Sequence, residues 1–400
     1  MKVAVMGYGV VGSGVVKVLS MNKKSISEKS INGEIEVKYI LDIKDINDEN
    51  SCLATKNFDD ILNDDEVKAV VETMGGVHPA FEFVTACLKK GKSVVSSNKE
   101  LVAEKGLEIM KIAEENGVLF EFEASVAGGI PVIRAITDSL NSNEITDIAG
   151  IINGTTNFIL TKMIEDNMDY ATALKLAQEN GYAEKDPTAD VEGLDAGRKI
   201  CILSALAYGK HIYPKQVYTQ GISTLSLKDV SLAGEFGYVI KLIARAKKEN
   251  DKLSVMVSPA LVSKESPLSF VKDVMNAVLI RGNAVKETML YGPGAGMMPT
   301  ASAVVSDVID VCNKYGKESY MFWKKEAEDG YVSDYLDCKT RLFVRGENFD
   351  THKIQETMGN VEFSKCGTAF ITQEDTERNL LSKIDSLNLA VKSVIRVVNY

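Results

Sequence analysis

A chain of 400 residues exceeds what a single hydrophobic core usually spans, so two or three domains are expected. Apolar residues make up 45% of it and charged residues 26%, which is typical of a folded globular protein and excludes intrinsic disorder. The net charge of -10, without any run of lysine or arginine, argues against nucleic acid and anionic membranes as partners. No signal peptide is recognisable, and no apolar stretch reaches the roughly 18 residues of a membrane span, so we expect a cytoplasmic protein with a small-molecule partner.

The amino-terminal stretch predicts a strand, a glycine turn and a helix. Residues 3–6 are apolar, GYGVVGSG follows at 7–14, and apolar residues then recur with helical spacing. In this context GxGxxG is typical of dinucleotide binding, because Gly7 permits the tight turn, Gly9 lets the backbone approach a pyrophosphate and Gly12 lets the helix pack on the strand. Amide groups at the start of the helix then hold the phosphates. The predicted cofactor-binding residues of this turn are Gly7, Gly9, Val10, Val11 and Gly12.

Strands and helices then alternate as far as residue 122. Strands are expected at 36–42, 68–73, 93–96 and 118–122, and helices at 79–90 and 101–116. This alternation predicts an α/β domain with a doubly wound parallel sheet of Rossmann type and right-handed crossovers. Ligands bind beyond the carboxyl ends of the strands in such a sheet, which makes Asn98 and Lys99 candidates for the site. A lysine at a helix start is either a solvated side chain or, because it opposes the helix dipole, a functional one.

The pattern changes after the first domain, which we place at 1–130. Residues 131–292 are expected to form an α+β domain for substrate binding and oligomerisation, with strand-like alternation at 238–260. A glycine-rich turn and a helix at about 293–315 are expected to return the chain to the nucleotide domain. Residues 320–400 then alternate between strand and helix character, which predicts a small βαββαβ module.

Residues 181–199, GYAEKDPTADVEGLDAGRK, hold five carboxylates and three cationic side chains and precede an apolar run. Asp195 and Lys199 are four residues apart, so on a helix they share one face. Asp190 is the expected N-cap of that helix, and Leu194 is expected on its apolar face. The spacing alone is most simply explained by an exposed ion pair, which stabilises the helix by about 0.2 to 0.5 kcal/mol. The apolar run favours instead a partly desolvated lysine whose proton affinity is tuned for acid–base chemistry, as a hydride-transfer enzyme needs.

Five motifs stand in a fixed order along the chain. They are GYGVVGSG at 7–14, SSNKE at 96–100, EASVAGGIPVIR at 123–134, GIINGTTNFIL at 150–160 and GYAEKDPTADVEGLDAGRK at 181–199. Together they resemble the motifs of the homoserine dehydrogenase family, and the resemblance covers residues 1 to about 315. It implies reversible oxidation of L-homoserine to L-aspartate 4-semialdehyde with NAD(P), a step toward threonine and methionine, by a homodimer or homotetramer.

The resemblance also implies roles for individual residues. Lys199 would give or take the proton at the substrate oxygen, with Asp195 orienting it and contacting substrate, and Lys99 would also lie at that oxygen. Glu184 and Asp190 would bind the amino and hydroxyl end of the substrate. The nucleotide would be lined by Thr73, Asn98, Lys99, Gly181, Glu184 and Gly296. A sodium ion would be held by the backbone carbonyls of Glu123, Val126, Gly128 and Ile130.

Three features bear on cofactor choice, helix stability and regulation. Asp42 ends the second strand, where an acidic residue bonds the ribose 2′-hydroxyl, so we expect NAD, although Lys44 could instead meet the 2′-phosphate of NADP. Gly197 stands where the family commonly has alanine, at a cost to the helix of roughly 1 kcal/mol. The carboxyl module resembles an ACT domain, but RGENFDTHK at 345–353 replaces the usual loop after its first strand, which argues against threonine feedback.

Two other functions compete with this one. Another amino-acid dehydrogenase on the same nucleotide fold should lack the carboxylate and lysine set of residues 184–199, which this chain has in full. A nicotinamide-sensing regulator without turnover should carry a DNA-binding helix-turn-helix or a broad basic face, and the sequence shows neither.

Overall fold

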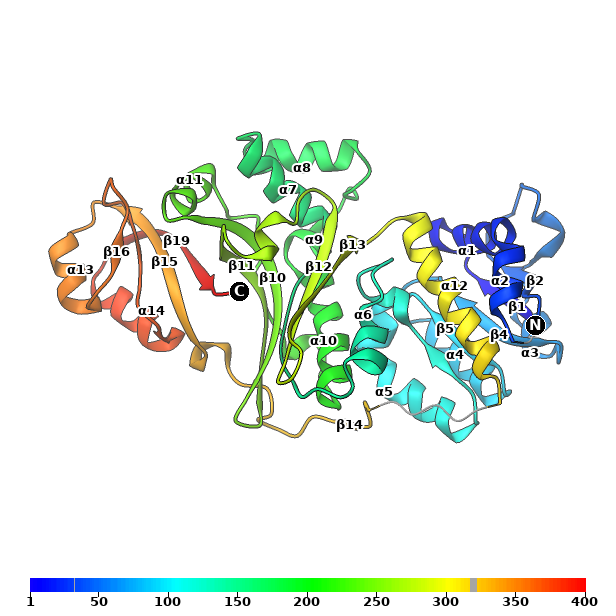
Figure 1. Cartoon of the computed structure of the whole chain (residues 1–400). Helices are drawn as coiled ribbons and strands as arrows, with labels where there is room; N and C mark the ends of the chain where they lie inside the picture. Colours follow the sequence, from blue (N-terminus) through cyan, green and yellow to red (C-terminus); the bar gives the residue numbers. More distant parts are fainter. Residues whose placement is uncertain (32, 317–321) are drawn as a thin grey trace. The chain divides into compact units, whose positions relative to one another are not determined.

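The computed structural model describes residues 1–31, 33–316 and 322–400, which fall into two compact units (Figure 1). The first unit comprises Met1–Glu144, Cys201–Pro214 and Gly292–Ala327, and the second comprises Ile145–Ile200, Lys215–Tyr291 and Glu328–Tyr400. The three domains expected from the sequence are a finer division, and they stay a prediction. Within the described ranges, no helix is long and apolar enough to cross a membrane.

The first unit is built on a six-stranded parallel sheet with the order β3-β2-β1-β4-β5-β6. Its strands are β1 (Lys2–Met6), β2 (Glu36–Leu41), β3 (Ala54–Thr55), β4 (Val67–Glu72), β5 (Ser93–Ser96) and β6 (Phe120–Glu121). Its helices include α1 (Val10–Met21), α2 (Lys23–Lys29), α3 (Phe58–Leu62), α4 (Ala80–Lys89), α5 (Lys99–Glu115), α6 (Val132–Arg134) and α12 (Met297–Lys314). This strand order is that of a dinucleotide-binding sheet and confirms the predicted Rossmann fold. Strand β1 is buried from Val3 to Met6, because helices cover both faces of such a sheet.

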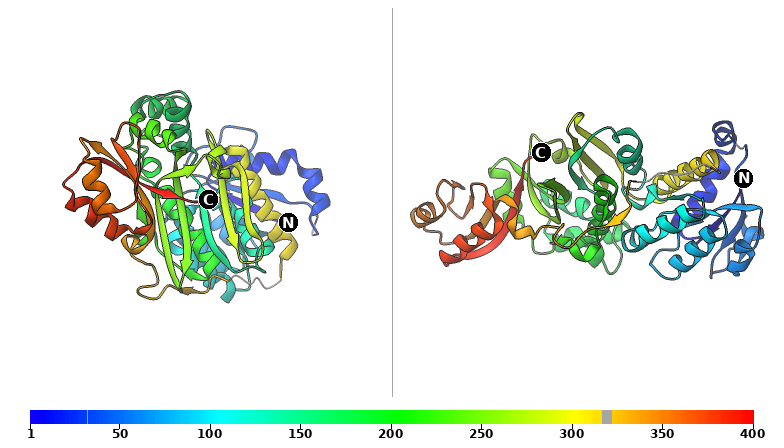
Figure 2. Two further views of the ribbon diagram at one scale, coloured as in Figure 1. Left: turned by 60° about the vertical axis from the view of Figure 1, so that its left-hand side comes forward. Right: turned by 90° about the horizontal axis from the view of Figure 1, so that it is seen from below.

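Helix α12, yellow in Figure 2, packs against the blue helix α1 although the two are far apart in the sequence. The contact is close because α1 has Gly14 there: a methyl group on this residue would lie 3.1 Å from Ala301 Cβ. Two short strands, β8 (Lys210–His211) and β14 (Lys325–Glu326), form a separate parallel pair in the same unit. The first unit therefore gathers three stretches of the chain that are distant in sequence.

The second unit is built on a mixed sheet whose main path runs β13-β12-β7-β10-β11-β19-β15-β17-β16. The first strands of this unit are β7 (Ile145–Ile151), β9 (Tyr218–Thr219), β10 (Tyr238–Glu249), β11 (Lys252–Ser263), β12 (Met275–Gly282) and β13 (Lys286–Pro293). The helices that accompany them are α7 (Gly154–Glu165), α8 (Tyr170–Glu179), α9 (Thr188–Val191), α11 (Leu227–Glu235) and the start of α10 (Leu194–Tyr208), whose residues from Cys201 onward belong to the first unit. The antiparallel pair of β10 and β11 confirms the strand-like alternation predicted at 238–260.

The carboxyl-terminal module has the predicted βαββαβ order. Its elements are β15 (Lys339–Glu347), α13 (Thr351–Met358), β16 (Glu362–Phe363), β17 (Ala369–Ile371), the short β18 (Asp375–Thr376), α14 (Glu377–Ser386) and β19 (Ala390–Val398). Strand β19 pairs in parallel with β11, so the module continues the sheet of the second unit. At this junction Arg396, 5% exposed, donates to both oxygens of Glu377 at 2.7 and 2.6 Å and to Gln220 Oε1 at 2.8 Å. Membership of the ACT class stays a prediction.

Candidate active site

The glycine turn between β1 and α1 has the backbone that a dinucleotide site needs. Gly7 has a φ of +93°, and a methyl group on it would lie 2.9 Å from the carbonyl oxygen of Thr73. A methyl group on Gly12 would lie 1.9 Å from the carbonyl oxygen of Gly7, which excludes any side chain there. On Gly9, the N-cap of α1, a methyl group would have no atom of the described residues within 4 Å. Open space therefore lies at the start of the helix formed by Val10 onward, where unbonded amide groups attract phosphates.

Two side chains brace this turn. Thr73, which follows β4, donates from Oγ1 to the carbonyl oxygen of Gly7 at 2.9 Å. Asp42, which follows β2, accepts from the backbone N–H of Tyr8 at 2.6 Å and from that of Lys44 at 2.9 Å. The Asp42 carboxylate is therefore anchored beyond the carboxyl end of β2, where the ribose of a dinucleotide lies in this fold. The Lys44 side chain is exposed.

Asn98 connects the ends of β4 and β5 and starts α5. Its Oδ1 caps the helix by accepting a backbone N–H at 3.1 Å, and its Nδ2 donates to the carbonyl oxygen of Gly76 at 2.6 Å. Lys99, the first residue of α5, is half-buried. Glu72, fully buried at the end of β4, accepts from Ser96 Oγ at 2.6 Å, and burial raises its pKa. The sequence did not single out Glu72, because as the last residue of a strand it has no distinguishing pattern.

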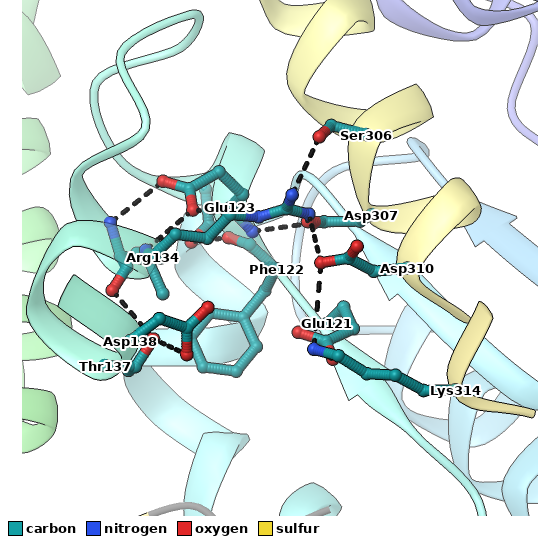
Figure 3. A network of polar contacts seen from close by, with 12 residues as sticks. Glu121, Phe122, Glu123, Arg134, Thr137, Asp138, Ser306, Asp307, Asp310 and Lys314 are labelled. Atoms are coloured by element: carbon teal, nitrogen blue, oxygen red, sulfur yellow. Dashed lines mark hydrogen bonds and ion pairs between the residues drawn. The ribbon is translucent and has the colours of Figure 1, made fainter. Parts of the chain in front are cut away.

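A buried network of charges holds the segment that leads to α6 (Figure 3). The Glu123 carboxylate accepts from the backbone N–H groups of Ile133 and Arg134, both at 2.9 Å. The Arg134 guanidinium donates to Asp307 of α12 at 2.5 Å, and Asp307 also accepts from the N–H of Glu123 at 2.8 Å. Burial raises the pKa of both carboxyls to about 7, and Arg134 opposes that rise. The network ties the loop that follows Glu123 to α12.

That loop, residues 126–130, suits a cation with oxygen ligands. Ala127 and Gly128 are both left-handed, with φ of 56° and 53°, so the backbone curls tightly. A methyl group on Gly128 would lie 2.5 Å from the carbonyl oxygen of Gly294, so a larger residue would not fit. Each carbonyl oxygen has two lone pairs, and a backbone hydrogen bond uses only one of them. Hard cations prefer oxygen ligands, so the carbonyls that the family resemblance names, three in this loop and that of Glu123 before it, are of the right chemical type for sodium.

The second unit contains a cluster of one lysine and two aspartates, in which Lys199 and Asp195 are buried and Asp190 is half-buried. Lys199 and Asp195 lie one turn apart on α10 and are 8% and 3% exposed, with 2.7 Å between Nζ and Oδ2. Lys199 Nζ also donates to the carbonyl oxygen of Ile152 at 2.8 Å. Asn153 donates from Nδ2 to Asp190 at 2.7 Å and to Asp195 at 2.9 Å. The pair of Lys199 and Asp195 is therefore desolvated, as the apolar run after it indicated, and is not an exposed ion pair.

Two local predictions about this segment are wrong. Asp190 does not cap α10, because it lies in the separate helix α9. Gly193, with a φ of +80°, interrupts the helical backbone between α9 and α10. The Asp190 carboxylate accepts from Asn153 instead. Leu194 is 42% exposed and does not belong to the apolar face, because it is the first residue of α10.

The remaining residues expected at the site lie in turns. Glu184 is exposed in the loop before α9, and its carbonyl oxygen accepts from Gln178. Gly181, with a φ of +74°, follows the C-cap of α8, and Gly296, with a φ of +112°, is the N-cap of α12. The structure thus brings together one set of expected residues in each unit. In the first unit these are Gly7, Gly9, Gly12, Asp42 and Thr73, while Asn98 is bonded to the loop after β4; in the second unit they are Asp190, Asp195 and Lys199.

Asn153 is the residue of this cluster that the sequence did not single out. It stands between β7 and α7, and its Oδ1 caps α7 by accepting from the N–H of Thr156 at 2.9 Å. An asparagine between a strand and a helix is a recognisable capping signal, but that signal concerns only the helix. Its contact with the two aspartates depends on residues far along the chain.

Two family models match the chain. One, described as the NAD binding domain of homoserine dehydrogenase, matches residues 7–123, and the other, described as homoserine dehydrogenase, matches residues 131–309. The homoserine dehydrogenase of Bacillus subtilis is 39% identical over 383 residues, which cover 92% of this chain and 86% of that protein.

Solved structures are similar as well. The crystal structure of a homoserine dehydrogenase from Thiobacillus denitrificans superposes with a TM-score of 0.91 and 35% identity, covering 100% of this chain and 98% of that one. A hyperthermophilic archaeal homoserine dehydrogenase in complex with NADPH has a TM-score of 0.67 and 26% identity, covering 78% of this chain and 98% of that one.

Proposed function

The chain belongs to the homoserine dehydrogenase family of NAD(P)-dependent oxidoreductases, and we propose that it interconverts L-homoserine and L-aspartate 4-semialdehyde with Lys199 as the group that moves the proton. The observation that most supports this role is the burial of Lys199 against Asp195, with 2.7 Å between Nζ and Oδ2. Burial disfavours the charged form of a lysine and a neighbouring carboxylate favours it. This balance suits a group that must both take and give a proton.

Oxidation removes a hydride from the carbon that bears the substrate hydroxyl and a proton from the hydroxyl oxygen. The nicotinamide ring supplies the hydride acceptor when the dinucleotide is bound. The neutral amine of Lys199 takes the proton, and in the reverse direction its ammonium form returns the proton to the carbonyl oxygen. Asp195 and the carbonyl oxygen of Ile152 hold Nζ in place during both steps. The family resemblance assigns Lys99, the first residue of α5, to the reacting oxygen as well, where an ammonium group would stabilise negative charge.

The substrate's amino group is a cation, and carboxylates bind it. Asp190 and Glu184 take this role, with Asp195 contributing to the same field. The cluster supports the assignment, because two aspartates beside one lysine leave an excess of negative charge when all three are ionised. Such an excess attracts an ammonium group, and salt screens it less at the buried Asp195 than at an exposed carboxylate.

We expect NAD to be preferred over NADP. The Asp42 carboxylate is anchored by two backbone N–H groups, and a carboxylate there bonds the ribose 2′-hydroxyl and repels a 2′-phosphate. The nucleotide is lined further by the glycine turn with Val10 and Val11 and by Thr73, Asn98, Gly181 and Gly296. Backbone carbonyls of Glu123, Val126, Gly128 and Ile130 hold a sodium ion. Assembly as a homodimer or homotetramer rests on the family resemblance alone, and the cytoplasmic location stays an expectation from the sequence.

The decisive experiment is the initial rate of nicotinamide reduction with L-homoserine, measured with NAD and NADP in parallel. Lys199→Ala should lower kcat by roughly 100-fold or more while the dinucleotide still binds, because an acid–base group contributes on that order. Lys175→Ala, which removes a lysine that is 77% exposed on α8, is the matched control and should leave the rate unchanged. Absence of turnover with either nucleotide, despite tight dinucleotide binding, would contradict the proposed function.

A further inference from the structure

Asn153 uses every hydrogen-bonding group of its side chain. The residue is 5% exposed, and its Nδ2 donates to Asp190 Oδ1 at 2.7 Å and to Asp195 Oδ2 at 2.9 Å. These are the two hydrogens that an amide nitrogen carries. Its Oδ1 accepts from the N–H of Thr156 at 2.9 Å and from Thr156 Oγ1 at 3.0 Å. The amide therefore has one orientation that fits, with nitrogen toward the carboxylates and oxygen toward the donors.

We propose that Asn153 is a positioning residue for the reaction, which sets the geometry between the aspartate that meets the substrate ammonium and the aspartate that holds the lysine. The inference rests on the proposed function above. Asp195 Oδ2 accepts from both Asn153 and Lys199, so the amide and the ammonium share one acceptor oxygen. The neighbouring Ile152 carbonyl accepts from Lys199 at 2.8 Å. One dipeptide between β7 and α7 thus holds all three charged groups of the cluster.

A neutral donor is the chemistry that this position requires. The two aspartates both lie within hydrogen-bond reach of one nitrogen, so their charges repel each other, and the two N–H groups offset that repulsion. A lysine or arginine in place of Asn153 would offset it too, but would cancel the negative charge that attracts the substrate. A carboxylate there would add to the repulsion. An amide keeps the geometry of the cluster and leaves its charge unchanged.

The capping of α7 must be separated from this positioning role. Serine and aspartate are N-caps about as good as asparagine, so Asn153→Ser and Asn153→Asp both keep the cap. Asn153→Asp retains the shape but puts a third carboxylate between the other two, whereas Asn153→Ser removes the donor and adds no charge. A residue that only caps the helix should be replaced at least as well by aspartate as by serine. A positioning residue should show the opposite order.

The test is kcat and KM for L-homoserine, together with thermal unfolding and dinucleotide affinity, for the wild type and both variants. Asn153→Ser should lose roughly 10- to 100-fold in kcat/KM, because it loses two hydrogen bonds to charged groups. The loss should appear both in KM, through Asp190, and in kcat, through Asp195 and Lys199. Asn153→Asp should lose more, and neither variant should change the dinucleotide affinity.

Asp169→Ser is the matched control. It exchanges the N-cap of the neighbouring helix α8, where Asp169 accepts from the N–H of Thr172 at 2.9 Å, and it should leave kcat and KM unchanged. If the wild type is active and Asn153→Asp is at least as active as Asn153→Ser, only the inference about Asn153 is overturned. Asn153 would then be no more than a helix cap. A wild-type protein that does not oxidise L-homoserine would overturn the proposed function and this inference together.

Discussion

Gly9 and Gly12 belong to one turn but differ in their tolerance for a methyl group, so Gly9→Ala and Gly12→Ala form a matched pair. On Gly12 the methyl group would lie 1.9 Å from the carbonyl oxygen of Gly7 and 2.9 Å from Thr73 Oγ1. Non-bonded heavy atoms prefer roughly 3.5 to 4.0 Å, so backbone must move by about 1 Å or more. Overpacking of this kind costs about 1 to 3 kcal/mol, and the upper end applies because backbone, not a flexible side chain, must yield.

On Gly9 the same methyl group meets open space among the described residues, and the φ of -79° is one that alanine adopts readily. Gly9→Ala should therefore change the unfolding free energy by no more than about 0.5 kcal/mol. The methyl group would, however, occupy the space in which the backbone approaches a pyrophosphate. We expect the Kd for NAD to rise by roughly tenfold or more, which corresponds to about 1.4 kcal/mol.

Thermal unfolding without ligand and a fluorescence titration with dinucleotide measure the two effects separately. Gly12→Ala should lower the unfolding midpoint by roughly 6 to 12 °C, and Gly9→Ala should weaken binding at an unchanged midpoint. Gly234→Ala on α11 is the control, because its methyl group also meets no described atom within 4 Å and lies in the second unit. Tight dinucleotide binding by Gly9→Ala, or a wild-type midpoint for Gly12→Ala, would refute this account of the turn.

Replacing a helical glycine by alanine should raise the free energy of unfolding by about 1 kcal/mol. Gly197→Ala, however, places a methyl group 3.3 Å from Thr219 Cγ2, so chemical unfolding should show only part of this gain. The full gain should appear when Thr219→Ser is added, because that change removes the crowding methyl group. Identical gains in both backgrounds would show that this contact is harmless. Burial raises the pKa of Glu121 to about 7, above an unfolded value of about 4.3, so stability is lost as pH rises through this interval. Glu121→Gln should therefore raise the unfolding midpoint at pH 8, where the buried carboxylate would be ionised, but not at pH 4. An equal rise at both pH values would contradict the raised pKa of Glu121. Arg396→Met leaves the carboxylate of Glu377 buried without its cation and should lower the free energy of unfolding by about 3 to 5 kcal/mol, measured by chemical unfolding. Adding Glu377→Leu should restore most of this lost stability, because no unpaired charge is then buried. A double variant as unstable as the single one would argue against an electrostatic cause.

The features that could be predicted from the sequence have causes within a few residues. The turn at 7–12 depends on Gly7 and Gly12, where backbone atoms leave no room for a side chain, so its pattern predicts its shape. The alternation of strands and helices leaves few topologies open, because connections between parallel strands are right-handed. The spacing of Asp195 and Lys199 likewise requires only a helix for the two side chains to meet. The prediction that Asp190 is the N-cap was wrong because Gly193 is left-handed and separates two helices. The sequence around a glycine does not by itself show that its φ is positive.

Contacts between distant parts of the chain were decided only by the tertiary structure. Asn153 meets Asp190 and Asp195 because the junction of β7 and α7 packs beside α9 and α10 in one unit. The pairing of Arg396 with Gln220 likewise follows from the placement of β19 beside β11. A polar group that is buried must find a partner, but which partner it finds depends on how the whole core packs. Sequence therefore determined the chemistry that each segment offers, and packing determined which of these groups act together.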